Sequence, residues 1–565
     1  MKKLFFIPCL ILFLAIGSGI GLGVKAETVG EKKTFYIDPS YDLSRREEIT
    51  AVLVKMTPKV YFYIDKNWWD FSLQNEVYQA LSELGEEFQN KIYPTLTSIF
   101  GPEWNPGVDK ESKITILIHP MKESAGGYFN SKDEYYKLQV PTSNEREMIY
   151  LNSKYITSPL AKSFLAHEFT HLITFNQKEN TYGITEDVWL NEARAEYAPT
   201  LVGYDDDYRG SNLERRAETF SRTPSDSLLE WENSEYDYGS INLFIHYLVD
   251  HYGIEVLVDS LHSSKTGIES INYALKKNGF EEDFSQIFLD WTIAVLINDC
   301  NYGPKYCYLN PSLRNFHVRP QINFLPLQGK STLTLADVTK NWTGNWYKVI
   351  GGRGKLKLSF IGGPGSSFKV PYITRTKSGG YIVSFLQLDD SQKGEAVIEG
   401  FGTENVALFV IPSLQIPETS DNKPFYSFSW SVSIEENNKE SELIQRLLKR
   451  IAELKAEIAK VQAKIAAILA AGGQKSSPKK IKNDLYYGLT NNEEVRLLQE
   501  FLRDQGPEIY PEGLVTGNFF SLTRAAVIRF QERYAPEILS PWGLIKGTGF
   551  VGPTTRKKIN ELLAK

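Results

Sequence analysis

The stretch FLAHEFTHLI at residues 164–173 is the most informative part of the chain. It places His167 and His171 four residues apart in an apolar segment. Four residues advance a helix by about 6 Å and return to nearly the same face. Both imidazoles can therefore reach one metal ion, with Glu168 beside them. A coincidental match would be a plain amphipathic helix, but two of only seven histidines in the chain fall here. The motif predicts a metal site on a buried helix.

A second segment, VWLNEARAEY at residues 188–197, offers a third ligand. It begins another apolar-faced helix, on which Glu192 and Glu196 lie one turn apart. A helix antiparallel to the first could present Glu192 to the ion. The result is a His₂Glu site with a fourth position for water, the pattern of catalytic zinc. Glu196 and Asn191 are then expected to lie in the second layer around the metal and to orient the residues that bind it. For Glu196 the alternative is a solvated glutamate.

These motifs give residues 111–300 a resemblance to the gluzincin metallopeptidases. The segment NEARAE at 191–196 is similar to the Asn-Glu-x-x-Ser-Asp motif of thermolysin-like enzymes, with Ala195 and Glu196 where that motif has Ser and Asp. The flanking WLNE at 189–192 and EYA at 196–198 look closer to the hyicolysin-type family. The resemblance implies a zincin-like fold and zinc-dependent endopeptidase activity on proteins or peptides.

The expected chemistry is hydrolysis by metal-activated water, with Glu168 as the general base. An oxyanion-stabilising donor is also needed. Tyr238 is the candidate, Tyr236 is its competitor, and a purely structural role is the alternative for both. An edge at Gly127, Tyr128 and Phe129 could pair with an extended substrate, since free strand edges bind peptides in this way. That edge could equally be only a loop.

The catalytic region is expected to span residues 33–310 as a mixed α+β domain, strand-rich at first and helical from about residue 183. Strand patterns are expected within Ala51–Ile64, Ile114–His119 and Met148–Leu151, and helices within Asn75–Phe100 and Ser158–Asn176.

Two smaller features lie in this region. Cys300 and Cys307 predict a disulfide if the chain is exported, and two free thiols otherwise. Asp205, Asp206 and Asp207 could bind calcium, although no full ligand spacing is present and a solvated acidic loop is the alternative.

The first 26 residues read as a signal peptide. Lys2 and Lys3 precede an apolar run from Leu4 to about Leu22, and the segment ending at Ala26 resembles a cleavage site. The rival interpretation is a retained membrane anchor, because the apolar run approaches spanning length. Export to the outside of the cell or to its envelope is therefore expected.

Three segments lie between the catalytic region and the C-terminal domain. Residues 311–434 have short strand patterns separated by turn residues, which predicts a β-sandwich accessory domain. Residues 440–471 carry a heptad pattern that predicts a self-associating coiled coil, with a helical spacer or a hairpin with another segment as the alternatives. Its core positions are Ile444, Leu447, Ile451, Leu454, Ile458, Val461, Ile465 and Ile468. Residues 472–480 are a polar linker.

Residues 481–565 form the last expected domain, and 484–563 resemble the peptidoglycan-binding domain type 1. The similar segments are EVRLLQEFL at 494–502, TGNF at 516–519, LTR at 522–524 and GFVGPTTR at 549–556. The pattern predicts a small three-helix bundle. The resemblance implies attachment to cell-wall glycan or peptide, and a generic protein-interaction bundle is the alternative.

The composition limits the remaining function classes. The 565-residue chain carries a formal net charge of −6, which argues against a general nucleic-acid binder. The expected function is a secreted zinc endopeptidase held at the cell envelope by its C-terminal domain. One alternative is a hydrolase of peptidoglycan stem peptides. The other is a non-catalytic envelope adhesin.

Overall fold

The computed structural model describes residues 27–327, 329–416, 425–435, 438–471 and 480–564. The chain is a multidomain α+β protein, as expected, and divides into two compact units, Met1–Ile444 and Gln445–Lys565. The expected signal peptide and residues 472–479 of the expected linker lie outside the described residues. Within the described ranges, no helix is both long and apolar enough to cross a membrane.

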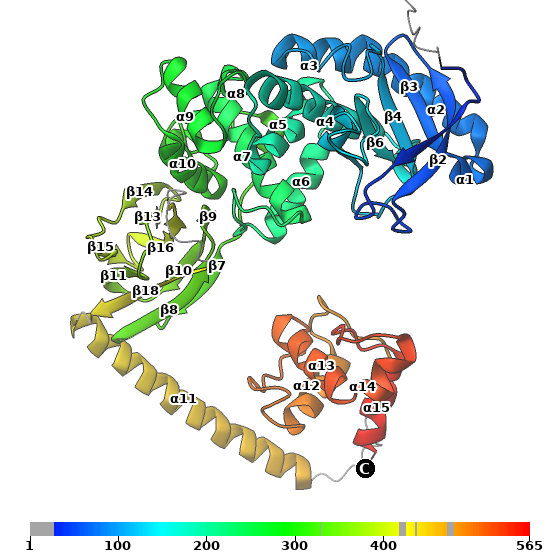
Figure 1. Cartoon of the computed structure of the whole chain (residues 1–565). Coiled ribbons are helices and arrows are strands. Elements are labelled where there is room, and N and C mark those ends of the chain that lie inside the picture. The colour runs from blue at the N-terminus through cyan, green and yellow to red at the C-terminus, as the bar shows by residue number, and fades with distance from the viewer. Residues whose placement is uncertain (1–26, 328, 417–424, 436–437, 472–479, 565) are drawn as a thin grey trace, which may run out of the picture. The chain divides into compact units, whose positions relative to one another are not determined.

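The first unit begins with a six-stranded mixed sheet in the spatial order β1-β2-β3-β4-β6-β5 (Figure 1). Strands β3, β4 and β6 pair in parallel, and the other neighbours are antiparallel. The order leaves the short strand β5 at one edge. The strands are β1 Lys32–Tyr36, β2 Glu48–Met56, β3 Val60–Asp65, β4 Ile114–His119, β5 Gly127–Phe129 and β6 Met148–Asn152.

The two faces of this sheet build different cores, because alternate side chains of a strand point to opposite faces. Phe62, Ile64 and Ile116 pack with helices α2 (Gln74–Glu87), α3 (Tyr93–Phe100) and α4 (Leu160–Phe175) in the main core. Tyr63 and Tyr150 belong to a separate aromatic core on the other face. The expected helix at 75–100 is interrupted by a π-helical turn at Phe88–Ile92.

The rest of the first unit is a helical part followed by a strand-rich part. The later helices are α5 Val188–Leu201, α6 Asn212–Arg222, α7 Glu235–Tyr252, α8 Glu255–Leu261, α9 Gly267–Lys277 and α10 Phe284–Ile297. Strands β7 to β18 lie between Gln321 and Glu435, in a nine-stranded and a three-stranded sheet. The helical part and the β part share a core: Trp342 and Trp346 belong to the main hydrophobic cluster, and Nε1 of Trp346 donates to the carbonyl of Thr292 at 2.9 Å.

Helix α11 (Asn438–Ala471) covers the heptad segment, and the described side chains of its pattern are exposed to solvent. The side chains of Ile444, Ile465 and Ile468 lie outside the described set. The C-terminal part of the second unit has its own core among α12 (Glu493–Asp504), α13 (Ser521–Arg533), the short α14 (Ala535–Ile538) and α15 (Pro553–Leu563).

A buried acidic pair in the first unit makes stability depend on pH. Glu134 and Glu147 are almost fully buried, and their carboxyl groups share a hydrogen bond when one is protonated. Burial, together with the charge of Asp109, raises the pKa of Glu147 to about 7. In the unfolded chain this group titrates near 4.5. The folded state therefore holds more protons between these values, and stability falls as the pH rises through that window.

We expect Glu147→Gln to remove this loss of stability at higher pH. The free energy of unfolding of the variant, relative to the original chain, should rise by about 1–3 kcal/mol between pH 4.5 and pH 8. Denaturant titrations of both proteins at the two pH values measure it. Glu86→Gln, an exposed position on α2, is the control. An equal pH response in the Glu147 variant and the original chain would contradict the assignment.

Candidate metal centre

The centre begins on α4, which is buried along most of its length. Nε2 of His167 and Nε2 of His171 lie 3.2 Å apart, so the two imidazoles present these nitrogens to the same point. This follows from their four-residue spacing, which returns the second ring to the face of the first. The two nitrogen atoms are close enough together to bind the same metal ion.

Helix α5 lies against α4 and brings Glu192 to the two rings. Oε2 of Glu192 is 3.2 Å from Nε2 of His167 and 3.6 Å from Nε2 of His171. The ligand atoms of all three residues lie within 4.8 Å of one another. Oε2 of Glu192 is buried and has no hydrogen-bond partner within the described ranges, which is costly unless a cation occupies the point it faces. These donors fit a zinc ion, which favours two imidazoles and a carboxylate.

The outer nitrogens of both rings are held by groups on α5. Nδ1 of His171 donates to Oδ1 of Asn191 at 3.0 Å, and Nδ1 of His167 lies 3.4 Å from Oε1 of Glu196. These contacts leave the Nε2 lone pairs free for a metal. Asn191 and Glu196 therefore lie in positions from which they can orient the two imidazoles, as the sequence analysis expects.

Glu196 is not a solvated glutamate. Its side chain is 1% exposed, and Arg216 donates to both of its oxygens at 2.9 and 2.6 Å. The amide groups of Asn212 and Asn242 also donate to Oε2, each at 3.0 Å. The sequence analysis did not identify Arg216. Its partner on α5 is 20 positions away, and no spacing rule connects two residues on different helices.

Buried negative charge makes the centre suited to a divalent cation. Burial raises the pKa of Glu168 to about 8. Burial opposes protonation of His167, but the hydrogen bond to Glu192 and the nearby carboxylates outweigh it and raise the pKa of His167 to about 9. Burial opposes ionisation of Glu196, but Arg216 and His167 lower its pKa to about 2. Glu168 and Glu192 form no ion pair with an arginine or lysine in the described part of the chain.

The centre opens into a cleft of about 830 Å³. Gly127 of β5 lies close to Glu168, because a Cβ at this glycine would come within 3.0 Å of Oε1 of Glu168 and 2.5 Å of the carbonyl oxygen of Tyr150. Any larger residue would therefore disturb the carboxylate. The cleft is lined by Ser40, Tyr41, Lys122–Gly127, Tyr155, Ser163, Phe164, His167, Glu168, Glu196, Pro199, Asn212, Arg215, Arg216, Asn233–Glu235 and Tyr238.

Two tyrosines reach this cleft. The ring of Tyr238, from the first turn of α7, lies 6.4 Å from the ring of His167 and is covered by Arg216 at 4.4 Å. Tyr41, which the sequence analysis did not identify, lines the same cleft. Burial and the charges of Glu168 and Glu192 raise the pKa of Tyr41 to about 12, so its hydroxyl keeps its proton. Tyr236 is not among the lining residues.

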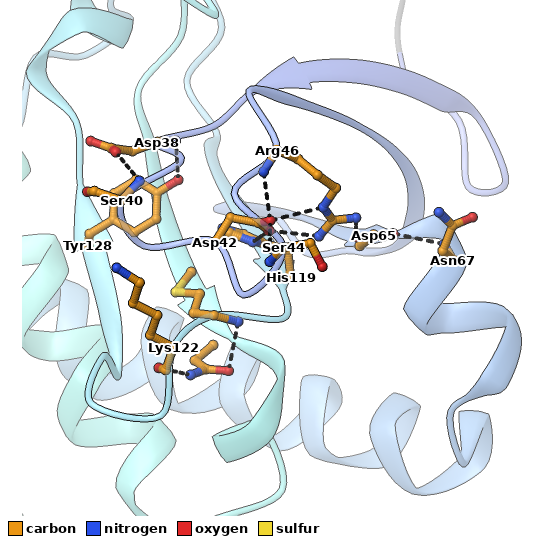
Figure 2. Close-up of polar contacts among 12 residues, drawn as sticks. Asp38, Ser40, Asp42, Ser44, Arg46, Asp65, Asn67, His119, Lys122 and Tyr128 are labelled. Carbon is orange, nitrogen blue, oxygen red and sulfur yellow. Dashed lines mark hydrogen bonds and ion pairs between the residues drawn. The ribbon is translucent and has the colours of Figure 1, made fainter.

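A polar network holds the loop that carries Tyr41 (Figure 2). Oδ1 of Asp42 lies 3.2 Å from Nδ1 of His119, and both side chains are fully buried. Arg46 bridges Asp42 and Asp65 at 2.7 and 2.6 Å. The backbone N–H of Lys122 donates to the carbonyl of Tyr41 at 2.9 Å, which ties the loop to the segment before β5. The network therefore positions one wall of the cleft.

The other expected residues fall in different places. The ring of Tyr128 is buried between Tyr41 and Tyr150, so only the backbone of this edge residue could meet a substrate. Phe129 stacks on His171 with ring centroids 6.2 Å apart. Cys300 and Cys307 form a disulfide. The carboxylate of Asp205 accepts hydrogen bonds from Thr200 and Leu213, and the described residues show no acidic cluster there with the geometry of a metal site.

The C-terminal helices contain an internal repeat. The buried side chain of Gln499 binds the turn at Thr516–Asn518 and the hydroxyl of Thr523. Gln531 makes the corresponding bonds to Gly549, Phe550 and Thr555, each 32 positions further along. An apolar pocket of about 250 Å³ beside the second turn is lined in part by Trp542, which is 62% exposed. Most of the residues that identify this region therefore support the fold.

Comparisons with known proteins agree with the expectation for this region. The profile of the peptidoglycan binding domain family PG_binding_1 matches residues 491–538. The match supports association with the cell wall or envelope, and the resemblance of this region to a peptidoglycan-binding domain is confirmed. No curated protein matches the chain.

Two solved structures show a weak likeness to parts of the chain. The pre-peptidase C-terminal domain of a collagenase from Bacillus anthracis is 14% identical, with a TM-score of 0.14, and the match covers 20% of this chain and 97% of that one. PliG of Aeromonas hydrophila, a periplasmic inhibitor of g-type lysozyme, is 13% identical, with a TM-score of 0.15, and the match covers 21% and 100%. At these scores neither likeness supports an inference about function.

Proposed function

We propose that this protein is a secreted zinc-dependent endopeptidase of the gluzincin type, held at the cell envelope by its C-terminal domain. One observation carries the proposal: the ligand atoms of His167, His171 and Glu192 lie within 4.8 Å of one another, and Glu168, the neighbour of His167 in the chain, lines the cleft beside them. The proposal includes a zincin-like fold for the first sheet and the helices α4 and α5. The position of His167, Glu168 and His171 on α4 and of Glu192 on the following helix α5 supports this part of the proposal.

His167, His171 and Glu192 would hold the metal, and Asn191 and Glu196 would orient the two imidazoles. When bound, zinc supplies Lewis-acid activation of water and of the scissile carbonyl. The carboxylate of Glu168 takes a proton from the attacking water and passes it to the leaving amine.

The remaining groups bind the substrate. The free edge of β5 offers the backbone of Gly127 and Phe129 to an extended peptide, which would lie beside Glu168. The hydroxyls of Tyr238 and Tyr41 keep their protons and can donate to the developing oxyanion. Tyr41 is thus a second candidate for the role assigned to Tyr238.

A second candidate function is hydrolysis of peptidoglycan stem peptides by the same residues, which the match of residues 491–538 favours. To separate the two, the mature chain is incubated with an unstructured protein and, in parallel, with purified wall material. We expect cleavage of the protein substrate. Release of wall peptides without protein cleavage would favour the second function, and cleavage of neither would favour a non-catalytic adhesin.

The role of the C-terminal domain is tested by a chain that ends at Ala471. We expect it to cleave the unstructured protein as fast as the whole chain, because the cleft lies entirely in the first unit. It should no longer sediment with wall material. Equal sedimentation of the two chains would contradict the proposed attachment.

A further inference from the structure

Arg215 of α6 is a cationic side chain that lines the cleft and forms no ion pair with the residues that the structure describes. Its Nη2 donates to Oδ1 of Asn212 at 2.6 Å, and its guanidinium lies over the ring of Phe164 at 5.6 Å. Its Nε is buried and has no hydrogen-bond partner among the described residues. A guanidinium has five N–H donors, and the bond to Asn212 is the one hydrogen bond that Arg215 makes among the described residues.

The nearby acidic groups already have partners or other roles. Glu196 is bound at both oxygens by Arg216, Glu235 pairs with Arg222, and Glu123 pairs with Lys154. In the described part of the chain, Arg215 therefore forms no ion pair. Burial, together with the adjacent charge of Arg216, lowers the pKa of Arg215 to about 10, which still leaves it cationic at neutral pH.

The place of Arg215 relative to the metal ligands is fixed by Phe164. This residue precedes His167 by three positions on α4, which is about one helical turn. One helical turn is about 5 Å, and the guanidinium lies a further 5.6 Å from the ring of Phe164. Because an extended peptide advances by about 3.3 Å per residue, a group at Arg215 would come from a residue within about three positions of the scissile bond. Glycine at position 126 permits this close packing against Phe164, because a Cβ there would lie 2.6 Å from the ring.

We propose that Arg215 binds a substrate carboxylate within about three residues of the scissile bond, so that the enzyme prefers an acidic residue or a chain terminus there. The inference rests on the proposed peptidase function and names its substrate class. Asn212 sets the orientation of the guanidinium, since its amide nitrogen is bound to Glu196 and its oxygen must therefore face Arg215. A planar guanidinium can then bind a carboxylate through two parallel hydrogen bonds.

The test first maps the bond cleaved by the whole mature chain in an unstructured protein, and then uses peptides that vary at each position within about three residues of that bond. One pair differs by Glu against Gln at an internal position, and a second pair differs by a free carboxyl terminus against an amide. We expect kcat/KM to favour one carboxylate member by at least about tenfold, because the site would otherwise keep a buried donor unpaired. The pair that responds identifies the source of the carboxylate.

The variants Arg215→Gln and Arg215→Glu separate binding from structure. Arg215→Gln should abolish the preference while still cleaving the neutral peptide, and Arg215→Glu should favour Lys at the same position. Arg209→Gln, an exposed arginine outside the cleft, should keep the preference. Cleavage of both members of each pair at equal rates by the original chain would overturn the subsite and leave the peptidase function standing.

Binding provides a readout that does not need turnover. In the Glu168→Gln chain, the Glu or free-terminus peptide should bind at least about tenfold more tightly than its neutral partner, and this difference should vanish when Arg215→Gln is added. Equal binding of charged and neutral peptides would overturn the proposal even if no peptide is cleaved. Tight, Arg215-dependent binding without cleavage in the original chain would instead overturn the peptidase function alone.

Discussion

Replacing Glu168 by glutamine is expected to lower kcat for peptide hydrolysis by about 10²- to 10⁴-fold, the usual contribution of a general base. Glutamine keeps the size of the side chain and cannot accept the proton from the attacking water. Zinc should remain bound, because Glu168 is not one of the three residues whose ligand atoms converge. The measurement compares kcat and zinc content in the two proteins.

The matched control is Glu123→Gln. Glu123 lines the same cleft, but its carboxylate is 82% exposed and pairs with Lys154 rather than facing the metal ligands. Its removal should change kcat by less than about twofold, since an exposed ion pair contributes little. Full activity in the Glu168→Gln protein would contradict the proposed mechanism. An equal loss of kcat in both variants would indicate that catalysis depends on the total negative charge of the cleft rather than on Glu168 in particular.

Replacing Glu192 by alanine should have the largest effect on the metal itself. The substitution removes the carboxylate that lies within 3.2 and 3.6 Å of the two ligand nitrogens. Asn191→Ala removes only the acceptor that orients His171, which should weaken zinc binding by about 10- to 100-fold. We expect the loss in the Glu192 variant to exceed that range.

Competition for zinc with a chromogenic chelator measures both affinities. The melting temperatures of the metal-free proteins show whether either variant is simply misfolded. Equal zinc affinity in the Glu192 variant and the original chain would remove Glu192 from the ligand set. In that event Glu196 could not replace it readily, because Arg216 already occupies both of its oxygens.

The sequence was most informative where the relevant contacts are local. His167 and His171 lie on one helical turn, so their spacing alone predicts that they converge. Strands β4 and β6 and helix α4 have nearly the expected bounds, because each combines a clear apolar pattern with polar or glycine-rich ends. The α+β class and the C-terminal family follow from patterns of the same local kind.

The sequence was least informative where residues meet only through tertiary packing. Tyr41 reaches the cleft from a loop more than a hundred positions before His167, and a network around Asp42 and His119 holds it there. Arg215 and Arg216 look alike in the sequence. Arg216 forms an ion pair with Glu196, whereas Arg215 forms no ion pair in the described part of the chain. No periodicity distinguishes them.

Helix α11 illustrates a different limit. Its heptad pattern predicts an apolar stripe, and the described part of that stripe is exposed in the single chain. Whether a second helix covers it depends on a partner that the pattern does not specify. In a parallel pair, Arg450 would approach Lys455 of the other helix, and the structure instead pairs Arg450 with Glu453 of its own helix.

The most direct test of the central claim is zinc titration of the mature, metal-free chain, with peptide cleavage followed in the same samples. The account predicts one zinc bound per chain, cleavage that rises in proportion to bound zinc, and complete loss of cleavage on adding a chelator. Cleavage that is unchanged by the chelator, or a protein in which substitution of His167 and His171 leaves zinc binding intact, would contradict it.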